Sequence, residues 1–205
     1  GVFLKTTYRM HSYVNSFISN AIYEGKLESA SDNDIQCIKV PSGYQGVLDK
    51  EAGIVPVSVC HEGNTQASQE EVDKIALLAK ELIGRIFISK EGVGRLIDWS
   101  DILFIAPYNH QVSKLKSALG DKARVGSVDK FQGQEAPIVF LSMCSSNANE
   151  SARGMDFLFN KNRINVAVSR SQCLAIIVYS RTLLETSASN LKQLEMVNLF
   201  CKLVV

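Results

Sequence analysis

One polar turn contains residue types that could hold a ligand against the protein backbone. In "SVDKFQGQE" (residues 127–135), Gly133 can take a positive φ or let a ligand approach the main chain. In the same turn, Gln132 and Glu135 can contact hydroxyl or amide groups with their side chains. A polar turn that uses glycine only for its geometry would have the same composition. The stretch therefore indicates either a ligand-binding turn or an ordinary one.

Arginines stand in two further stretches. In "NKNRINVAVSRSQ" (160–172), Arg163 and Arg170 are seven residues apart, which places both on one face of an expected helix. Two guanidinium groups on one face can bind a phosphate with always-charged, planar donors. In the stretch that begins "TTYRMH" at residue 6, Arg9 comes just before an amphipathic pattern. Single arginines are more often solvated surface residues, so neither stretch alone identifies a site.

Strands and helices must position these residues. Apolar, β-branched runs bounded by turn residues predict buried strands at residues 35–40, 54–60, 101–108, 124–128, 136–144 and 173–180. Helical patterns lie at residues 11–23, 68–87, 109–119, 160–170 and 190–202. This alternation predicts an α/β fold with a mostly parallel sheet covered on both faces. Ligands of such sheets gather at the carboxyl ends of the strands, where we expect the polar residues of "PYNHQ" and "SVDKFQGQE".

The clearest helix begins at Ser68, which we expect to be its N-cap, with Glu71 completing a capping box. Two segments show no regular pattern. Residues 41–68 are rich in glycine and polar residues around one strand, which predicts an irregular excursion. Residues 145–159 are expected to form a long exposed loop, and loops of that length are often functional.

Composition narrows the class of protein. The chain has 205 residues, 46% of them hydrophobic, which predicts one globular domain with a proper core. The formal net charge of +1 gives no overall field for nucleic acid, so any polyanion site must be local. No apolar run is long enough to span a bilayer, so no membrane partner is expected. The first residues have no signal-peptide pattern and resemble a cut inside a longer chain.

Cysteine and histidine spacing indicates no metal site. The five cysteines are scattered without a CxxC pair, which favours reduced thiols and a cytoplasmic location. His11, His61 and His110 have no metal-ligand spacing, and structural or surface roles are favoured for them.

Taken together and in order, the three stretches resemble the motifs of a known family. "TYRMH" resembles motif IV, "SVDKFQGQE" motif V and "NRINVAVSR" motif VI of superfamily 1 helicases, in the branch of the nonsense-mediated-decay helicase, and "IAPYNHQV" is similar to the segment between the first two. The resemblance runs from about residue 4 to residue 181 and is to the second, C-terminal RecA-like domain. It implies a RecA-like three-layer α/β/α fold of the P-loop NTPase type. No GxxxxGK[ST] string occurs, so the chain lacks a P-loop of its own.

The resemblance implies a role for each motif residue. Arg9 and Arg170 would be arginine fingers for the γ-phosphate of ATP. Glu135 would meet the ribose, Gly133 would leave room for the nucleotide, Gln132 would order the turn, and Arg163 would belong to the same nucleotide site. Ser127, Tyr108 and Asn109 would contact the backbone of single-stranded nucleic acid, with DNA favoured over RNA and the choice left open.

The resemblance also implies partners. An N-terminal RecA-like domain of the same chain would hold most of the ATP and the Mg²⁺, so the 205-residue fragment alone is expected to be inactive. A narrower resemblance, in "RGMDFLFNKNRINVAVSR" and the tail "NLKQLEMVNLFCKLV", is to bacterial proteins that join a RecB-like nuclease domain to such a helicase. The alternative hypothesis is a non-catalytic, helicase-like module that binds nucleic acid or acts as a scaffold.

Overall fold

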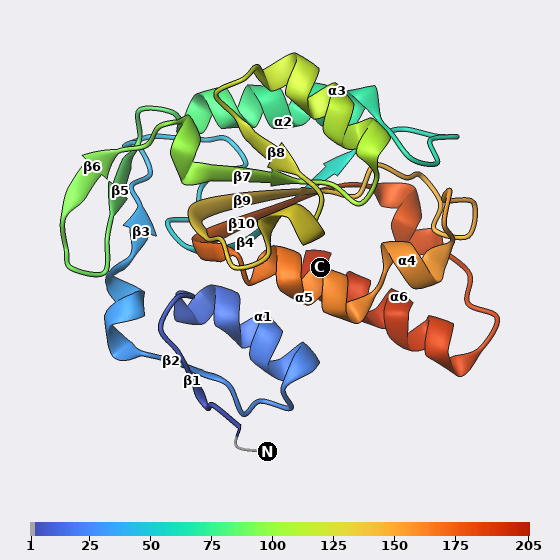
Figure 1. Cartoon of the computed structure of the whole chain (residues 1–205), viewed down its shortest axis with the longest axis horizontal. Coiled ribbons are helices and arrows are strands. Elements are labelled where there is room, and N and C mark those ends of the chain that lie inside the picture. Colours follow the sequence, from blue (N-terminus) through green and yellow to red (C-terminus); the bar gives the residue numbers. More distant parts are fainter. Residues whose placement is uncertain (1–2) are drawn as a thin grey trace.

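A computed structural model, which describes residues 3–205, has a five-stranded parallel sheet between two layers of helices (Figure 1). The spatial order is β4-β10-β9-β7-β8. The strands are β4 (Gly53–Val59), β7 (Ile102–Ile105), β8 (Arg124–Gly126), β9 (Ala136–Ser142) and β10 (Ser171–Ser180). The predicted α/β class, the parallel sheet and five of the six predicted strands are confirmed.

Helices cover both faces of this sheet (Figure 1). One layer consists of α2 (Gln69–Leu82) and α3 (Asn109–Leu119), and the other of α1 (Ser12–Ile22), α5 (Lys161–Val168) and α6 (Leu191–Val204), with the short α4 (Met155–Leu158) beside α6. All five predicted helices are present with shifted ends. The second ends at Leu82, because Gly84 takes a φ of 84° and the chain then enters a strand.

Smaller elements lie outside the main sheet. β1 (Thr6–Thr7) pairs with β2 (Glu28–Ser29), and β3 (Cys37–Ile38), β5 (Ile86–Ile88) and β6 (Gly94–Leu96) form an antiparallel sheet. The 3-10 helices are η1 (Ser31–Ile35), η2 (Trp99–Asp101), η3 (Asp129–Phe131) and η4 (Arg181–Glu185). The strand predicted at residues 35–40 is therefore wrong as a main-sheet strand. The β5–β6 hairpin was missed because every residue of β6 is exposed and gives no apolar pattern.

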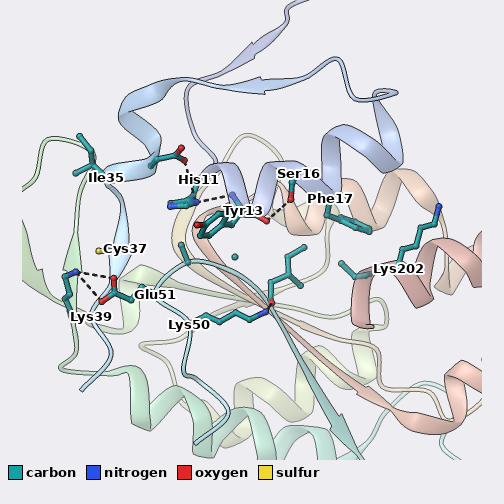
Figure 2. A pocket seen from close by; sticks show the side chains of 15 residues that line it. His11, Tyr13, Ser16, Phe17, Ile35, Cys37, Lys39, Lys50, Glu51 and Lys202 are labelled. Carbon is teal, nitrogen blue, oxygen red and sulfur yellow. Dashed lines mark hydrogen bonds and ion pairs between the residues drawn. The ribbon is translucent and has the colours of Figure 1, made fainter. Parts of the chain in front are cut away.

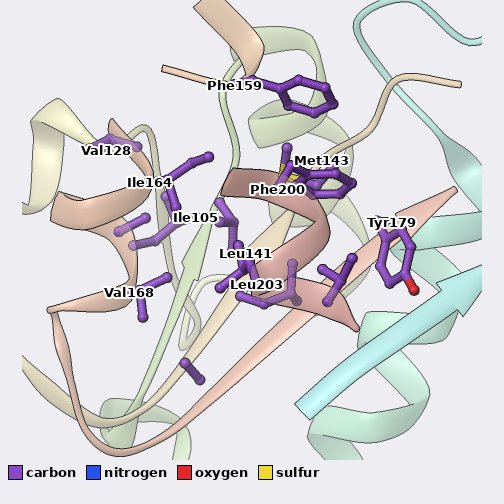
Figure 3. Packing of buried hydrophobic residues seen from close by; sticks show 14 of the residues in the cluster. Ile105, Val128, Leu141, Met143, Phe159, Ile164, Val168, Tyr179, Phe200 and Leu203 are labelled. Atoms are coloured by element: carbon purple, nitrogen blue, oxygen red, sulfur yellow. The ribbon is translucent and has the colours of Figure 1, made fainter. Parts of the chain in front are cut away.

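Two apolar clusters hold the helix layers on the sheet. On one face, Phe104 of β7 stacks on Phe140 of β9 with ring centroids 5.3 Å apart. On the other, Phe159 stacks on Phe200 of α6 at 4.6 Å, above Leu141 and Leu203 (Figure 3). Each such buried side chain contributes about 1.5–3 kcal/mol of burial free energy. The strands between these clusters are rigid supports for the polar residues at their ends.

The sheet has a carboxyl edge and an amino edge, because all five strands run the same way. Asn109 and Ser127 follow β7 and β8 and lie at the carboxyl edge, whereas Glu135 and Arg170 directly precede β9 and β10 and lie at the amino edge. A seven-residue strand such as β9 is about 23 Å long. The expectation that both polar stretches lie at the carboxyl edge is confirmed for "PYNHQ" and for the start of "SVDKFQGQE" at Ser127, but the end of the second stretch, Glu135, lies at the amino edge. A connection between parallel strands starts at one edge and ends at the other.

The segment after β9 is more buried than its composition predicts. Ser145, Ser146 and Ser151 are at most 6% exposed. The Ser146 amide donates to the carbonyl of Asn64 (2.8 Å). The loop predicted at residues 145–159 is therefore present over 145–154 but is partly buried and anchored on the neighbouring segment, and residues 155–158 form α4. The irregular character of residues 41–68 around β4 is confirmed.

Candidate functional site

Four side chains meet at the amino edge, and we call them the amino-edge cluster: Arg9, Glu135, Arg170 and Gln172. Arg9 and Glu135 form an ion pair through Nε and Oε2. The second oxygen of Glu135 accepts from Nε2 of Gln172 at 2.9 Å. Arg9 also donates from Nη1 to the carbonyl of Ser169 at 3.0 Å. The fold thus pairs Arg9 with Glu135 and brings Arg170 close enough for the charges of both to act on it.

Backbone pairing fixes this arrangement. Ala136 of β9 lies opposite Ser171 of β10, and the Ala136 amide donates to the carbonyl of Arg170 at 3.0 Å. Glu135 and Arg170 therefore leave neighbouring strands side by side. The amide of His11 donates to the carbonyl of Gln172 at 2.7 Å, which ties the segment after Arg9 to the same edge. Three stretches far apart in the sequence are held together by main-chain bonds.

The charges of the cluster do not cancel, because it contains two guanidinium groups and one carboxylate, and only Arg9 is paired with that carboxylate. Partial burial alone would raise the pKa of Glu135, but the bonds from Arg9 and Gln172 outweigh it and hold that pKa below its ordinary value. Partial burial and the nearby charge of Arg9 lower the pKa of Arg170. Nε of Arg170 is buried without a partner among residues 3–205. An anion of suitable shape would satisfy this donor and neutralise the excess charge.

The turn before Glu135 is open to solvent. Gly133 has a φ of 80°, which confirms the predicted positive φ, and a Cβ added there would meet nothing within 4 Å. Gln132 is exposed, and its side chain makes no hydrogen bond within the described part of the chain. The structure therefore leaves free space beside Gly133, as a ligand would need, without bringing Gln132 into the cluster.

Two residues of this edge were missed from sequence. Gln172 binds Glu135, and its signal was a polar residue two positions after Arg170 at the start of a strand. Tyr8 is 74% exposed beside Arg9, and both line an open hollow of about 450 Å³ together with Glu135 and Ser169. Its signal was an aromatic residue directly before the arginine. An exposed ring at the mouth of a polar hollow is suited to stacking on a planar group.

The carboxyl edge holds the residues predicted to contact nucleic acid. Ile105 pairs with Gly126, which brings the segments after β7 and β8 together. Asn109 is exposed at the start of α3, and Ser127 is half-buried. Tyr108 is only 6% exposed, and its hydroxyl is buried without a partner among residues 3–205. Phe157 packs on the ring of Tyr108, so little of Tyr108 reaches the surface, and its contact with nucleic acid stays a prediction.

Arg163 does not belong to the amino-edge cluster. It lies in the first turn of α5, donates to Asp129 at 3.2 Å, and places its guanidinium 4.3 Å from the ring centre of Phe157. The helix ends at Val168, so the rule that residues seven apart share a face does not reach Arg170. α5 runs from the carboxyl edge to the amino edge, and the two arginines lie at its opposite ends. The structure places Arg163 with Asp129 and Phe157, and its role at the nucleotide site stays a prediction.

A buried polar network lies behind the carboxyl edge. Glu71 accepts from Nε2 of His61 (3.0 Å), from the hydroxyl of Ser142 and from the amide of Cys144 (3.0 Å), and the Glu71 and His61 side chains are 0% exposed. Desolvation raises the pKa of Glu71 against these bonds. Ser68 does cap α2 by accepting from the Glu71 amide, but the Glu71 carboxylate points into this network. The predicted capping box is therefore only half formed.

The network extends to α3 and to the loop after β9. Nδ1 of His61 bonds the hydroxyl of Ser146 at 2.8 Å. Gln111 of α3 donates to Ser142 at 2.9 Å and accepts from the Ser68 amide at 2.9 Å. Each link joins a segment at the carboxyl edge to the core. His61 therefore has the structural role that its spacing favoured.

Another hollow, of about 770 Å³, lies at the amino end of β4 (Figure 2). It is lined by residues such as His11, Cys37 and Lys202. Lys39 is paired with Glu51, and Lys50 donates to the carbonyl of Ile54. Burial lowers the pKa of His11, which accepts from the Tyr13 amide as the N-cap of α1. These bonds occupy Lys39, Lys50 and Glu51 locally, and neither Arg9 nor Arg170 lines this hollow.

Within residues 3–205, no group of three histidine, cysteine or acidic side chains could hold a metal ion. No helix in the same range is long and apolar enough to cross a membrane. Burial raises the pKa of the Cys144 thiol, and of the Cys173 thiol, above the ordinary value.

Residues 1–182 match the AAA_12 family, which is described as an AAA domain. The chain is 32% identical over 187 residues to DNA-binding protein SMUBP-2 of Mesocricetus auratus, covering 87% of this chain and 18% of that protein. It is 29% identical over 187 residues to DNA polymerase alpha-associated DNA helicase A of Saccharomyces cerevisiae, covering 86% and 27%. A Danio rerio protein named as a helicase, mov-10-B.2, is 29% identical over 205 residues, covering 89% and 20%. The chain thus spans between 18% and 27% of the length of these relatives.

Proposed function

The chain belongs to the AAA_12 family, the C-terminal RecA-like part of superfamily 1 helicases, and we propose that it is the second motor domain of an ATP-dependent helicase or translocase. The observation that carries this proposal is the amino-edge cluster, where Arg9 is paired with Glu135, the charges of both act on Arg170, and Nε of Arg170 has no partner in residues 3–205. Such a set of donors fits the phosphates of a nucleotide held by another domain. The names of two relatives, a DNA helicase and a DNA-binding protein, support the same assignment.

In this proposal the two arginines act on the γ-phosphate. Arg170 donates to it, and Arg9 is oriented by its bonds to Glu135 and Ser169 until the phosphate competes with Glu135 for the guanidinium. Both groups neutralise negative charge that develops during phosphoryl transfer. Glu135 then has one oxygen free for a ribose hydroxyl, and the ring of Tyr8 stacks on the base. Mg²⁺ and the phosphate loop come from the first RecA-like domain.

The carboxyl edge is the proposed nucleic-acid face. Ser127 and Asn109 present a hydroxyl and an amide there that make no side-chain bond within residues 3–205, and both can donate to a backbone phosphate. Contacts of this kind do not read sequence. We assign single-stranded DNA as the favoured partner and leave RNA as an outcome of the test. A nuclease partner domain and a cytoplasmic location stay predictions from the sequence.

The segment 127–135 connects the two proposed ligands. It leaves β8 at the carboxyl edge with Ser127 and enters β9 at the amino edge with Glu135. Phe131 in its middle is 2% exposed and anchors the segment in the core. A shift of Glu135 on ATP binding would therefore reach Ser127, which makes this segment the proposed coupling element.

The test is ATP hydrolysis by the protein at its natural length, with and without single-stranded DNA or RNA, for wild type and Arg170→Ala. We expect stimulated hydrolysis to fall about 1,000-fold or more in the variant. Thermal unfolding should stay unchanged, because Arg170 makes a single long bond of 3.4 Å to the Gln134 carbonyl. Arg181→Ala, which removes an exposed arginine at the other edge, is the matched control. If Arg170→Ala hydrolyses ATP like wild type, the domain is a non-catalytic scaffold.

A further inference from the structure

An exposed patch covers the place where Tyr108 was expected to reach the surface. The ring of Phe157 lies 5.3 Å from the ring of Tyr108, centre to centre. Two guanidinium groups pack on the ring of Phe157: that of Arg153 lies 3.9 Å and that of Arg163 4.3 Å from the ring centre. We call Arg153, Phe157 and Arg163 the arginine–phenylalanine patch. The patch packs on the core through the contact of Phe157 with Tyr108.

The local fold fixes Phe157 and Arg153 in place. Gly154 takes a φ of 73° and starts α4, whose Met155 and Leu158 are buried at 3% exposure, so that Phe157 is left half-exposed between them. The residue before Arg153, Ala152, donates its amide to the carbonyl of Thr65 at 3.1 Å. Arg153 therefore projects from an anchored segment and not from a free loop. Because the Arg153 guanidinium already packs on the ring, its side chain loses little further conformational freedom when it binds a ligand.

The charge of the patch is incompletely balanced. Arg163 is paired with Asp129 at 3.2 Å, but Asp129 is 74% exposed, so the pair is weak. Arg153 is exposed and makes no ion pair with any residue of the range 3–205. Two cations on one ring repel each other, and an anion bound between them would remove that repulsion. Planar guanidinium groups are well suited to the oxygens of a phosphate.

The patch adjoins the proposed nucleic-acid face. Phe157 and Arg163 line one small apolar hollow with Pro107 and Val128, the neighbours of Tyr108 and Ser127 in the chain. A strand held at Asn109 and Ser127 therefore continues directly onto the patch.

We propose that Arg153, supported by Phe157, binds a backbone phosphate of single-stranded nucleic acid and extends the strand path beyond Ser127. This inference rests on the proposed function, since it assigns a further contact to the same ligand. The contact is electrostatic and independent of sequence, so it responds to salt. The ring of Phe157 keeps the guanidinium in position and provides an apolar edge for the sugar.

The experiment measures binding of fluorescent oligo(dT) and oligo(U) by anisotropy, without ATP and over a series of salt concentrations, using the protein at its natural length. Arg153→Ala should weaken binding about 5- to 10-fold and reduce the slope of log K against log salt by about 1. Arg153→Lys should restore the slope but only part of the affinity, because an ammonium group stacks less well on the ring. Phe157→Leu, which keeps apolar volume over Tyr108, should weaken binding by a smaller factor without changing the slope.

The matched control is Lys122→Ala, which removes an exposed cation between α3 and β8, away from the patch. ATP hydrolysis without nucleic acid should be equal in wild type and Arg153→Ala. Unchanged affinity and unchanged slope in Arg153→Ala, in a wild type that binds, overturn this inference alone. If the wild type binds neither polymer, the proposed function fails and the inference fails with it.

Discussion

Strand β9 has a cluster of polar residues at each end. The two clusters differ in how completely their buried polar atoms are hydrogen-bonded. At its start, Glu135 is paired with Arg9, and the Arg9 and Glu135 side chains are 30% and 43% exposed. At its end, Ser142 belongs to the network of Glu71 and His61, whose side chains are 0% exposed. Nε of Arg170 at the first cluster is without a partner in residues 3–205, whereas both oxygens of Glu71 are bonded.

In the proposed function, this difference separates a cluster that binds a ligand from a network that stabilises the fold. Buried polar atoms are bonded in nearly all folded proteins, so a buried donor left open at an edge with excess charge indicates a missing acceptor. The Glu71 network has no such gap. If Nε2 of His61 carries the proton, it donates to Glu71 while Nδ1 accepts from Ser146, and the neutral ring satisfies both bonds.

The largest expected effect on stability follows from the buried network. Glu71→Ala would leave His61, Ser142 and the Cys144 amide without their acceptor. We expect the free energy of unfolding to fall by about 3–5 kcal/mol, as when one partner of a buried pair is removed. Urea unfolding measures this loss of unfolding free energy. Glu135→Ala, the matched change at the exposed end of β9, should cost less than about 1 kcal/mol. Equal losses of unfolding free energy in the two variants would contradict the proposed difference between the two ends of β9.

A smaller effect is expected in the pH dependence of stability, with opposite signs for the two carboxylates. The folded-state pKa of Glu71 is raised, so ionisation is costlier in the folded protein, and its contribution should fall as pH rises above about 4.5. The folded-state pKa of Glu135 is lowered, so its contribution is present above about 4.5 and lost as pH falls through that lower pKa.

These two pH dependences are measured as unfolding free energies at a series of pH values for wild type, Glu71→Gln and Glu135→Gln. The advantage of wild type over Glu71→Gln should shrink toward neutral pH. Its advantage over Glu135→Gln should shrink toward acid pH. Slopes of the same sign for both substitutions would show that the two carboxylates do not differ in the way the structure implies.

Much of the fold was predictable, because apolar runs and helical patterns depend on local sequence. The strands at residues 136–142 and 171–180 are recognisable from uninterrupted apolar residues that must be buried on both faces. The cluster of Arg9, Glu135 and Arg170 was predictable only through the family resemblance. Spacing alone was consistent with unrelated surface arginines.

The errors arise where a contact distant in sequence decides the outcome. Tyr108 reads as an exposed residue after a strand until Phe157, 49 positions later, covers it. Glu71 fits a local capping pattern, but His61 and Ser142 offer its carboxylate better partners. Arg163 and Arg170 fit one helical face, but the helix ends between them at Val168.

The most direct test of the account is the binding of fluorescent ADP with and without aluminium fluoride, in the presence of Mg²⁺, to wild type and Arg170→Ala at natural length. The complex of ADP with aluminium fluoride mimics the transition state of phosphoryl transfer, so only residues that act on the γ-phosphate should bind it differently from ADP. We predict equal affinity of both proteins for ADP, and a gain on adding aluminium fluoride that is about 100-fold smaller in Arg170→Ala. An equal gain in both proteins would contradict the assignment of the amino edge to ATP.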